Sequence, residues 1–424
     1  MLDIKFIREN KELLKNVANK KSIKVDLDRL VYLDDERKNL NQKIEELRAT
    51  KNNVSKKIPN MSSAEKEQAL AEMKNVDALQ KEIETKLSPL MSEYDTLMLE
   101  VPMYVDEKTP TGPDDTYNVE ILRFGEPRKF SFIPKEHMQL GVDLDIIDNE
   151  RAVKIGGSRS YILKGDGARL EAAMIKYAED FISRKNYELM SVPVMVNEQA
   201  LIGTGFFPGA EEEIYQLPKD DKYLVGTSEV ALGSYYSNEI LDVSQLPIKF
   251  AGFSVCFRRE AGSYGKDTRG LYRVHQFYKV EQFVIGENNL AKSRQAHEEL
   301  LSNSQELLES LGLPYRVLNI CTGDMGKGKY YMNDIETWMP SRNNYGETHS
   351  CSTLLDFQAR RLNLRYRDNE GKIHFCHTLN NTVAAVPRLL IPIMENYQDE
   401  DGSIIIPEVL RPYMDNQEKI VRKK

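Results

Sequence analysis

The sequence has few cysteines and no long apolar run. Only Cys256, Cys321, Cys351 and Cys376 occur among 424 residues, and they form neither a CxxC pair nor the spacing typical of zinc ligands. We therefore expect reduced thiols, a cytoplasmic location and no zinc. The N-terminal residues MLDIKFIREN lack the apolar core of a signal peptide, and no apolar stretch approaches membrane-spanning length.

Positive charge is also in short supply. The chain carries 58 Lys and Arg against 66 Asp and Glu, a formal net charge of -8. This balance excludes a generally basic nucleic-acid binder, so any contact with RNA must use a local basic patch. With 41% hydrophobic residues, the chain is long enough to bury a sizeable core and to form two domains.

The most informative stretch is CFRREAGSYGKDTRGLYRVHQFYKVEQFVIG, residues 256–286. A loop with Gly262, Gly265 and Gly270 separates an apolar lead-in from a segment, 271–285, that alternates with the period of a strand. The pattern predicts a long antiparallel hairpin. Its strand ends carry charges beside apolar neighbours, namely Arg258, Glu260, Arg273 and Glu281. These charges suit either a phosphate and carboxylate site or the ion pairs of a solvated edge hairpin.

The N-terminal quarter predicts a helical arm. Residues 3–19 suggest a first helix opened by Asp3. Heptads then run through 30–58 and 73–101, separated by Pro59 and by a capping box, so the two helices should form an antiparallel coiled coil. Pro89 should kink the second helix. Basic residues gather on the first helix and acidic ones on the second, which fits ion pairing within the hairpin or a basic flank for RNA.

Three further segments carry candidate site residues. Thr227 and Glu229 in TSE, placed on a strand, would point to the same side. Glu347 and Ser350 in ETHS are hard oxygen donors of the kind Mg²⁺ prefers, although both residue types are also common on a solvated strand end. The glycine and lysine loop at 323–329 lacks the GxxxxGK[ST] spacing, so a phosphate-binding P-loop is excluded.

Taken together, these motifs resemble the seryl-tRNA synthetases. FRREAGSYGKDTRGLYRVHQF followed by KVEQ is similar to motif 2 of that family. A helical stripe over 170–181 and a strand over 187–196 with Pro193 resemble motif 1, and HTLNNTVAAVPRLL resembles motif 3. The chain departs from the family at His349, where the pattern is closer to EISS, and at 380–383, where NGSG is common.

This resemblance implies an α+β fold with a coiled-coil arm and a class II catalytic domain, an antiparallel sheet flanked by helices. The domains would be 1–106 and 107–424, with motif 1 forming a homodimer. The arm would grip the long variable arm of the tRNA. The implied activity is that of an ATP-dependent serine–tRNA ligase, a cytoplasmic enzyme of protein biosynthesis that charges tRNA(Ser), with tRNA(Sec) as an alternative acceptor.

The resemblance also implies the site residues. Arg258 would contact the α-phosphate and the substrate carboxylate, and Arg388 the γ-phosphate, as catalytic residues. Further ATP contacts would come from Arg259, Glu260, Val274, Phe277, Glu347, Thr348, His349 and Ser350, with Glu347 and Ser350 holding Mg²⁺. Serine would be bound by Thr227, Ser228, Glu229, Glu281 and Thr382.

Two other functions fit parts of this pattern. A related enzyme could pass activated serine to an acceptor other than tRNA, but the intact heptads of the arm count against it. A non-catalytic scaffold is disfavoured because the charged residues of the three motifs are retained together.

Overall fold

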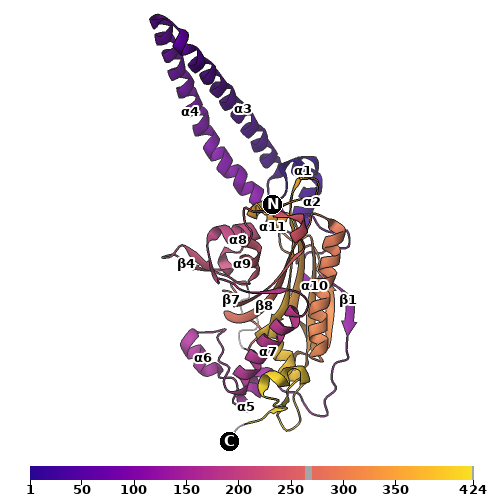
Figure 1. Cartoon of the computed structure of the whole chain (residues 1–424). Helices are drawn as coiled ribbons and strands as arrows, with labels where there is room; N and C mark the ends of the chain where they lie inside the picture. Colours follow the sequence, from indigo (N-terminus) through magenta and orange to yellow (C-terminus); the bar gives the residue numbers. More distant parts are fainter. Residues whose placement is uncertain (263–269, 423–424) are drawn as a thin grey trace. The chain divides into compact units, whose positions relative to one another are not determined.

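The computed structural model describes residues 1–262 and 270–422 (Figure 1). Two compact units result, one of Leu2–Pro102 and one of Met103–Lys424 together with Met1. Within the described ranges, no helix combines the length and the apolar composition that crossing a membrane requires.

The first unit is entirely helical. Its elements are α1 (Ile4–Glu9), α2 (Lys11–Lys20), α3 (Leu27–Lys57), the 3-10 turn η1 (Ile58–Asn60) and α4 (Ser63–Glu100). Asp3 caps α1, as predicted, by accepting a hydrogen bond from the Lys5 amide. The single helix expected over 3–19 is wrong, because Asn10 leaves helical geometry with φ -118° and ψ 29°. The Asn10 side chain then donates to the Phe6 carbonyl, which ends α1.

The two long helices α3 and α4 form the predicted hairpin (Figure 1). The capping box is confirmed, since Ser62 and Glu65 exchange side-chain and backbone hydrogen bonds at the start of α4. Two cations, Arg37 and Lys51, fall at heptad core positions of α3 and find partners on α4. The Arg37 guanidinium lies 4.6 Å from the centroid of the Tyr94 ring, and Lys51 pairs with Asp77 at 2.5 Å.

Some basic residues of α3 form ion pairs with acidic residues of α4. Arg29 pairs with Glu93 at 2.7 Å and Arg48 with Glu84 at 3.8 Å. By contrast, three exposed lysines of α3 make no ion pair with any described residue: Lys43, Lys56 and Lys57. Basic charge therefore remains open to solvent along the first helix of the hairpin.

The second unit is built on an eight-stranded sheet. Its strand order is β1-β9-β10-β11-β14-β8-β7-β2, and every pairing is antiparallel except that of β2 with β7. The strands are β1 (Val119–Phe124), β9 (Tyr315–Asn319), β10 (Tyr331–Met339), β11 (Asn344–Leu355), β14 (His377–Ala385), β8 (Gln276–Gly286), β7 (Ile248–Phe257) and β2 (Glu188–Ser191). This antiparallel sheet with flanking helices confirms the expected fold class.

Smaller elements surround the sheet. Three small sheets pair β3 (Met195–Val196), β5 (Lys222–Leu224) and β4 (Tyr215–Leu217); β6 (Ile240–Asp242), β12 (Arg365–Arg367) and β13 (Ile373–Phe375); and β15 (Ile404–Ile405) with β16 (Lys419–Ile420). The helices are α5 (His137–Asp143), α6 (Asn149–Gly156), α7 (Asp166–Ser183), α8 (Glu198–Thr204), α9 (Glu229–Ser234), α10 (Leu290–Ser310), α11 (Phe357–Leu362) and α12 (Val386–Asn396). Short 3-10 turns are η2 (Asp115–Tyr117), η3 (Glu211–Glu213), η4 (Val243–Gln245), η5 (Pro340–Arg342) and η6 (Glu408–Met414).

One face of the sheet is covered by α10 (Figure 1). Polar side chains on this face form hydrogen bonds with α10. Gln282 on β8 and Asn381 on β14 both donate to the Leu300 carbonyl, at 3.0 Å and 2.7 Å. Because side chains alternate along a strand, the neighbours of these residues face the other side of the sheet. That side is where the candidate site lies.

The central hairpin is confirmed as β7 and β8, paired from Ile248 with Ile285 to Phe257 with Gln276. The return strand begins at Gln276 rather than at Leu271. The His275 amide donates to the Arg159 carbonyl at 3.1 Å, so it is bonded outside the hairpin ladder. The middle of the expected loop, residues 263–269 with Gly265, lies outside the described residues.

The strand expected over 187–196 is interrupted. It forms β2 and β3 in two different sheets, with Pro193 between them. Proline has no amide hydrogen to donate to a strand partner, so it is placed where pairing stops. β2 is the last strand of the large sheet, an edge position that suits a strand followed by proline.

Pro89 lies inside α4, which continues through it from Ser63 to Glu100. The exposed proline leaves the Thr85 carbonyl without its helical donor. We expect Pro89→Ala to slow amide hydrogen exchange over residues 84–95, with a local opening free energy higher by up to about 3 kcal/mol. The neighbouring exposed Ser88→Ala should change exchange little, and unchanged protection in Pro89→Ala would contradict the prediction.

Candidate active site

A cavity of about 220 Å³ lies on the open face of the large sheet. Residues from three strands, from the chain after β7 and from the start of α12 line it together. They include twelve of the residues singled out in the sequence: Thr227, Glu229, Arg258, Glu260, Val274, Phe277, Glu281, Glu347, Thr348, Ser350, Thr382 and Arg388. The fold therefore gathers residues that are up to 161 positions apart in sequence.

Strand alternation explains which side chains of β8 enter the cavity. Phe277, Lys279 and Glu281 line it, whereas Gln282 turns to α10 and donates to Leu300 and Ser304. On β14, Thr382 lines the cavity while Asn381 bonds the same helix. Alternate side chains of β8 and β14 therefore face either the cavity or α10, as the period of two in the sequence predicts.

The spacing of Glu347 and Ser350 requires an irregularity in β11. In a regular strand, residues three apart point to opposite faces. Here Ile335 pairs with His349 and Glu336 with Glu347, so Thr348 is an extra residue without a partner on β10. This β-bulge shifts the alternation by one residue, and both Glu347 and Ser350 line the cavity.

Glu347 is held between like and opposite charges. Its Oε2 lies 3.1 Å from an Arg388 nitrogen, and Arg388 also lies over the Tyr272 ring at 4.9 Å. Burial would raise the pKa of Glu347, but Arg388 and Arg258 hold it below its usual value. Asp334 on β10 is the opposite case, because burial and the nearby Glu347 raise its pKa well above the ordinary range.

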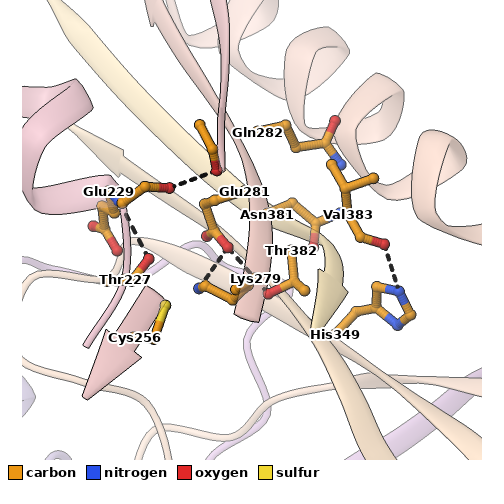
Figure 2. Close-up of polar contacts among 12 residues, drawn as sticks. Thr227, Glu229, Cys256, Lys279, Glu281, Gln282, His349, Asn381, Thr382 and Val383 are labelled. Carbon is orange, nitrogen blue, oxygen red and sulfur yellow. Dashed lines mark hydrogen bonds and ion pairs between the residues drawn. The ribbon is translucent and has the colours of Figure 1, made fainter. Parts of the chain in front are cut away.

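Thr227 and Glu229 lie together, but not on a strand as expected. β5 ends at Leu224, and Glu229 is the first residue of α9. The Glu229 amide donates to the Thr227 hydroxyl at 3.2 Å, and both side chains line the cavity (Figure 2). Between them, the Ser228 hydroxyl is buried and donates to the Gly252 carbonyl. The turn that leads into α9, rather than strand alternation, brings the Thr227 and Glu229 side chains together.

The side-chain amide of Gln358 holds the Glu229 carboxylate in position. Gln358 on α11 donates to it at 2.8 Å, and the Thr378 hydroxyl donates to the Gln358 oxygen at 2.7 Å. Gln358 has no exposed surface. A chain of buried hydrogen bonds therefore sets the direction in which Glu229 presents its oxygens.

Glu281 sits in a buried polar cluster with Lys279 and Thr382 (Figure 2). The Lys279 ammonium lies 2.5 Å from Glu281 Oε2, and the Thr382 hydroxyl donates to the same oxygen at 3.3 Å. Burial raises the pKa of Glu281, and Lys279 opposes that effect. The Lys279–Glu281 ion pair and the Thr382 hydroxyl therefore lie side by side in the cavity, where they could bind a polar group of a ligand.

Arg258 and Glu260 stand at the mouth of the cavity. The Arg258 guanidinium lies 5.3 Å from the Phe277 ring and donates to the Gly226 carbonyl at 3.3 Å. Glu260 pairs with Arg273 at 3.2 Å and adopts a positive φ of 54°, which is uncommon for a residue with a side chain. Val274 also lines the cavity. Arg259 instead lies 5.8 Å from the Tyr215 ring, away from the described cavity lining.

Sequence reasoning missed several residues of this site. Lys279 could have been found, because it lies two positions before Glu281 on the same strand and so shares its face. Gln358 and Thr378 could not, since only the packing of α11 against β14 brings them to Glu229. Thr348 and His349, which the resemblance assigns to ATP, differ in position: Thr348 lines the cavity, whereas His349 is 1% exposed beneath it.

An antiparallel sheet that presents arginines, carboxylates and hydroxyls around one cavity defines a class II aminoacyl-tRNA synthetase core. The family model described as the tRNA synthetase class II core domain (G, H, P, S and T) matches residues 213–397. A second family model, the seryl-tRNA synthetase N-terminal domain, matches residues 1–105. The chain belongs to the seryl-tRNA synthetase family.

Relatives and solved structures agree with this assignment. The chain is 44% identical to the serine–tRNA ligase of Deinococcus radiodurans, over 99% of this chain and 98% of the relative. It is 40% identical to that of Nitrosopumilus maritimus, over 99% and 100%. The Pyrococcus horikoshii seryl-tRNA synthetase complexed with ATP matches with a TM-score of 0.92 and 36% identity, covering both chains fully.

A second solved structure, the cytoplasmic serine–tRNA ligase of Naegleria fowleri in complex with AMP, has a TM-score of 0.87 and 32% identity. It covers 100% of this chain and 99% of its own. These matches extend through the arm. The alternative of a related enzyme that serves another acceptor therefore gains no support from them.

The buried pair of Lys279 and Glu281 leads to a stability prediction. Lys279→Met should lower the free energy of unfolding by about 3–5 kcal/mol, because it leaves the Glu281 carboxylate buried without its cation. Urea denaturation should show that Lys279→Met with Glu281→Gln recovers most of this loss. The half-exposed pair of Lys249 and Glu299 is the control, and Lys249→Met should cost about 1 kcal/mol or less. Equal losses in the two lysine variants would contradict the prediction.

Proposed function

We propose that this protein activates L-serine with ATP and transfers it to the 3′ end of tRNA(Ser). The observation that carries this proposal is the composition of one cavity. It joins two arginines, Arg258 and Arg388, to the oxygen donors Glu347 and Ser350 and to the acidic pocket of Glu229 and Glu281. These groups match an anionic nucleotide and a small amino acid with a hydroxyl side chain.

The nucleotide end would be held by stacking and by arginines. Phe277 offers a ring to the adenine, Glu260 contacts the adenine or its ribose, and Val274 and Thr348 lie along the nucleotide. Arg258, whose guanidinium lies over Phe277 and donates to the Gly226 carbonyl, contacts both the α-phosphate and the serine carboxylate. Arg388 takes the γ-phosphate end. Arg259 lies outside the cavity lining, so its contact to ATP remains the family expectation.

Glu347 and Ser350 fit a magnesium ion. Their carboxylate and hydroxyl oxygens are hard donors that the bulge brings to one cavity, and phosphate and water oxygens would complete the octahedral set that Mg²⁺ requires. When bound, the ion neutralises charge on the phosphate oxygens. Arg388, 3.1 Å from Glu347, holds the carboxylate in place.

The serine end would use the acidic pocket. Thr227 and Glu229 accept the α-ammonium group, with Ser228 anchoring their turn to β7. Glu281 and Thr382 bind the side-chain hydroxyl, and Lys279 neutralises Glu281. Alanine would leave these polar groups unpaired, so the pocket would reject it.

The reaction then needs positioning more than proton transfer. The carboxylate of serine is already ionised at neutral pH, so it attacks the α-phosphorus without a general base, and pyrophosphate leaves. Arg258 and Arg388 stabilise the charge that spreads over the phosphate oxygens. In the second step, the terminal ribose hydroxyl of the tRNA attacks the carbonyl of seryl-adenylate and AMP leaves.

Removing Arg258 tests this assignment. Arg258→Ala should lower kcat/KM for serine-dependent pyrophosphate exchange by at least 10²-fold, because a preorganised charge on the α-phosphate is lost. The exposed Arg367, which donates to the Gly371 carbonyl in its own turn, provides the control Arg367→Ala with unchanged exchange. Near-normal exchange in Arg258→Ala would overturn its role.

We further propose that residues 1–106 form the tRNA-binding domain and residues 107–424 the catalytic domain. The basic flank of α3 supports this, because Lys43, Lys56 and Lys57 are exposed and make no ion pair with any described residue. A two-helix rod with such a flank can contact the phosphates of a long variable arm without reading bases. The tRNA acceptors proposed are tRNA(Ser) and, as a second acceptor, tRNA(Sec).

Shortening the arm tests whether it is needed for transfer of serine to tRNA but not for activation of serine. Replacing residues 30–100 by a short Gly-Ser linker should leave pyrophosphate exchange intact and lower aminoacylation of bulk tRNA at least 10²-fold. Lys43, Lys56 and Lys57 changed together to Gln should raise KM for tRNA about 10-fold and reduce its dependence on salt. Aminoacylation that is unchanged in both variants would show that the arm has another role.

A homodimer through motif 1 and a cytoplasmic location complete the proposal. The edge strand β2, which lies in the motif 1 stretch, supports a partner, because Leu189 on β2 is 43% exposed and Met195 on β3 is 58% exposed. Apolar side chains on an uncovered sheet edge favour association. The proposed tRNA substrates support a cytoplasmic location.

A further inference from the structure

Two neighbouring strands of the site each contain a bulge. On β11 the extra residue is Thr348, between Glu347 and His349. On β14, Thr382 pairs with Glu281 and Ala384 with Val280, so Val383 is extra. An extra residue loses its place in the ladder and needs other partners to keep one conformation.

The side chain of His349 joins these two bulges, and Figure 2 shows its contact with the Val383 carbonyl. Its Nε2 lies 3.1 Å from the Val383 carbonyl oxygen, and its Nδ1 lies 2.9 Å from the Thr348 hydroxyl. A carbonyl only accepts, so Nε2 carries the hydrogen and Nδ1 accepts from Thr348. Burial lowers the pKa of His349 to about 4, in agreement with a neutral ring.

The bonded chain continues to a third strand. The Thr348 and Thr337 hydroxyls lie 2.7 Å apart. Since Thr348 donates to His349, Thr337 donates to Thr348. All of these groups are buried, with Thr337 and Val383 at 0% exposure. Strands β10, β11 and β14 are therefore tied at one level by a chain of hydrogen bonds through Thr348 and His349.

Each bulge sets the direction of a proposed ligand group. The bulge at Thr348 brings Glu347 and Ser350 to the same cavity, and the bulge at Val383 follows directly after Thr382. The bond from His349 to the Val383 carbonyl connects the two bulges directly.

We propose that His349 is a positioning residue that locks both bulges and so aligns the nucleotide end of the cavity with the serine end. This inference rests on the proposed function, because it assigns a cause for the alignment of Glu347, Ser350 and Thr382. His349 acts through backbone and hydroxyl groups, without touching the substrates.

Substitution of His349 tests the proposal with binding as the readout. We expect His349→Leu to weaken binding of a non-hydrolysable seryl-adenylate analogue, measured by calorimetry, by about 10–100-fold, as is typical for groups that orient ligating residues. KM for serine and KM for ATP should both rise. His349→Gln retains a donor near Nε2 and should recover binding to within about 3-fold of the original chain.

A second buried histidine provides the matched control. His297 on α10 bonds Thr353 on β11 and Asn333 on β10, each at 2.9 Å, and lies outside the described cavity lining. Burial lowers its pKa to about 4 as well. His297→Leu should lower the thermal midpoint as much as His349→Leu does, yet bind the analogue within about 2-fold of the original chain.

The outcomes separate this inference from the proposed function. If the original chain fails to bind the analogue, the proposed function is wrong. If the original chain binds it and His349→Leu binds equally well, or loses no more affinity than His297→Leu, only the role of His349 is wrong. Should His349→Leu not fold, Thr348→Val removes the donor to Nδ1, and unchanged affinity in that variant would overturn the proposal.

Discussion

Pairing of carboxylates with cations inside one cavity of the sheet is the interaction on which this site depends. Glu281 and Glu347 lie in one cavity, where burial penalises both charges. Lys279 and Arg388 each sit within 3.1 Å of one of them. Without these cations, burial would favour the protonated form of both carboxyl groups.

The sheet supplies the rigidity that this pairing needs. Hydrogen bonds from Gln282 and Asn381 to α10 fasten one face, so the opposite face presents its charges at fixed spacing. Bulges then correct the pleat where function requires two neighbouring groups on one side, as with Glu347 and Ser350. A regular strand could not place both of them in the cavity.

Much of the architecture was predictable because it depends on local pattern. Heptads and the capping box of Ser62 and Glu65 predict the arm, and strand alternation predicts the hairpin of β7 and β8. The errors have local causes too. Asn10 divides one expected helix, Pro193 divides one expected strand, and Thr227 lies in a turn into α9 rather than on a strand.

By itself, the sequence determined the class of the protein, the two-part organisation and most of the residues around the cavity, since motif order and periodicity are properties of the chain. Only the tertiary structure decided how those residues meet. Gln358 reaches Glu229 from 129 positions away, and His349 on β11 reaches Val383 on the neighbouring strand β14. Such contacts depend on register and on bulges, which are set by the packing of neighbouring strands and leave no periodic signal in the sequence.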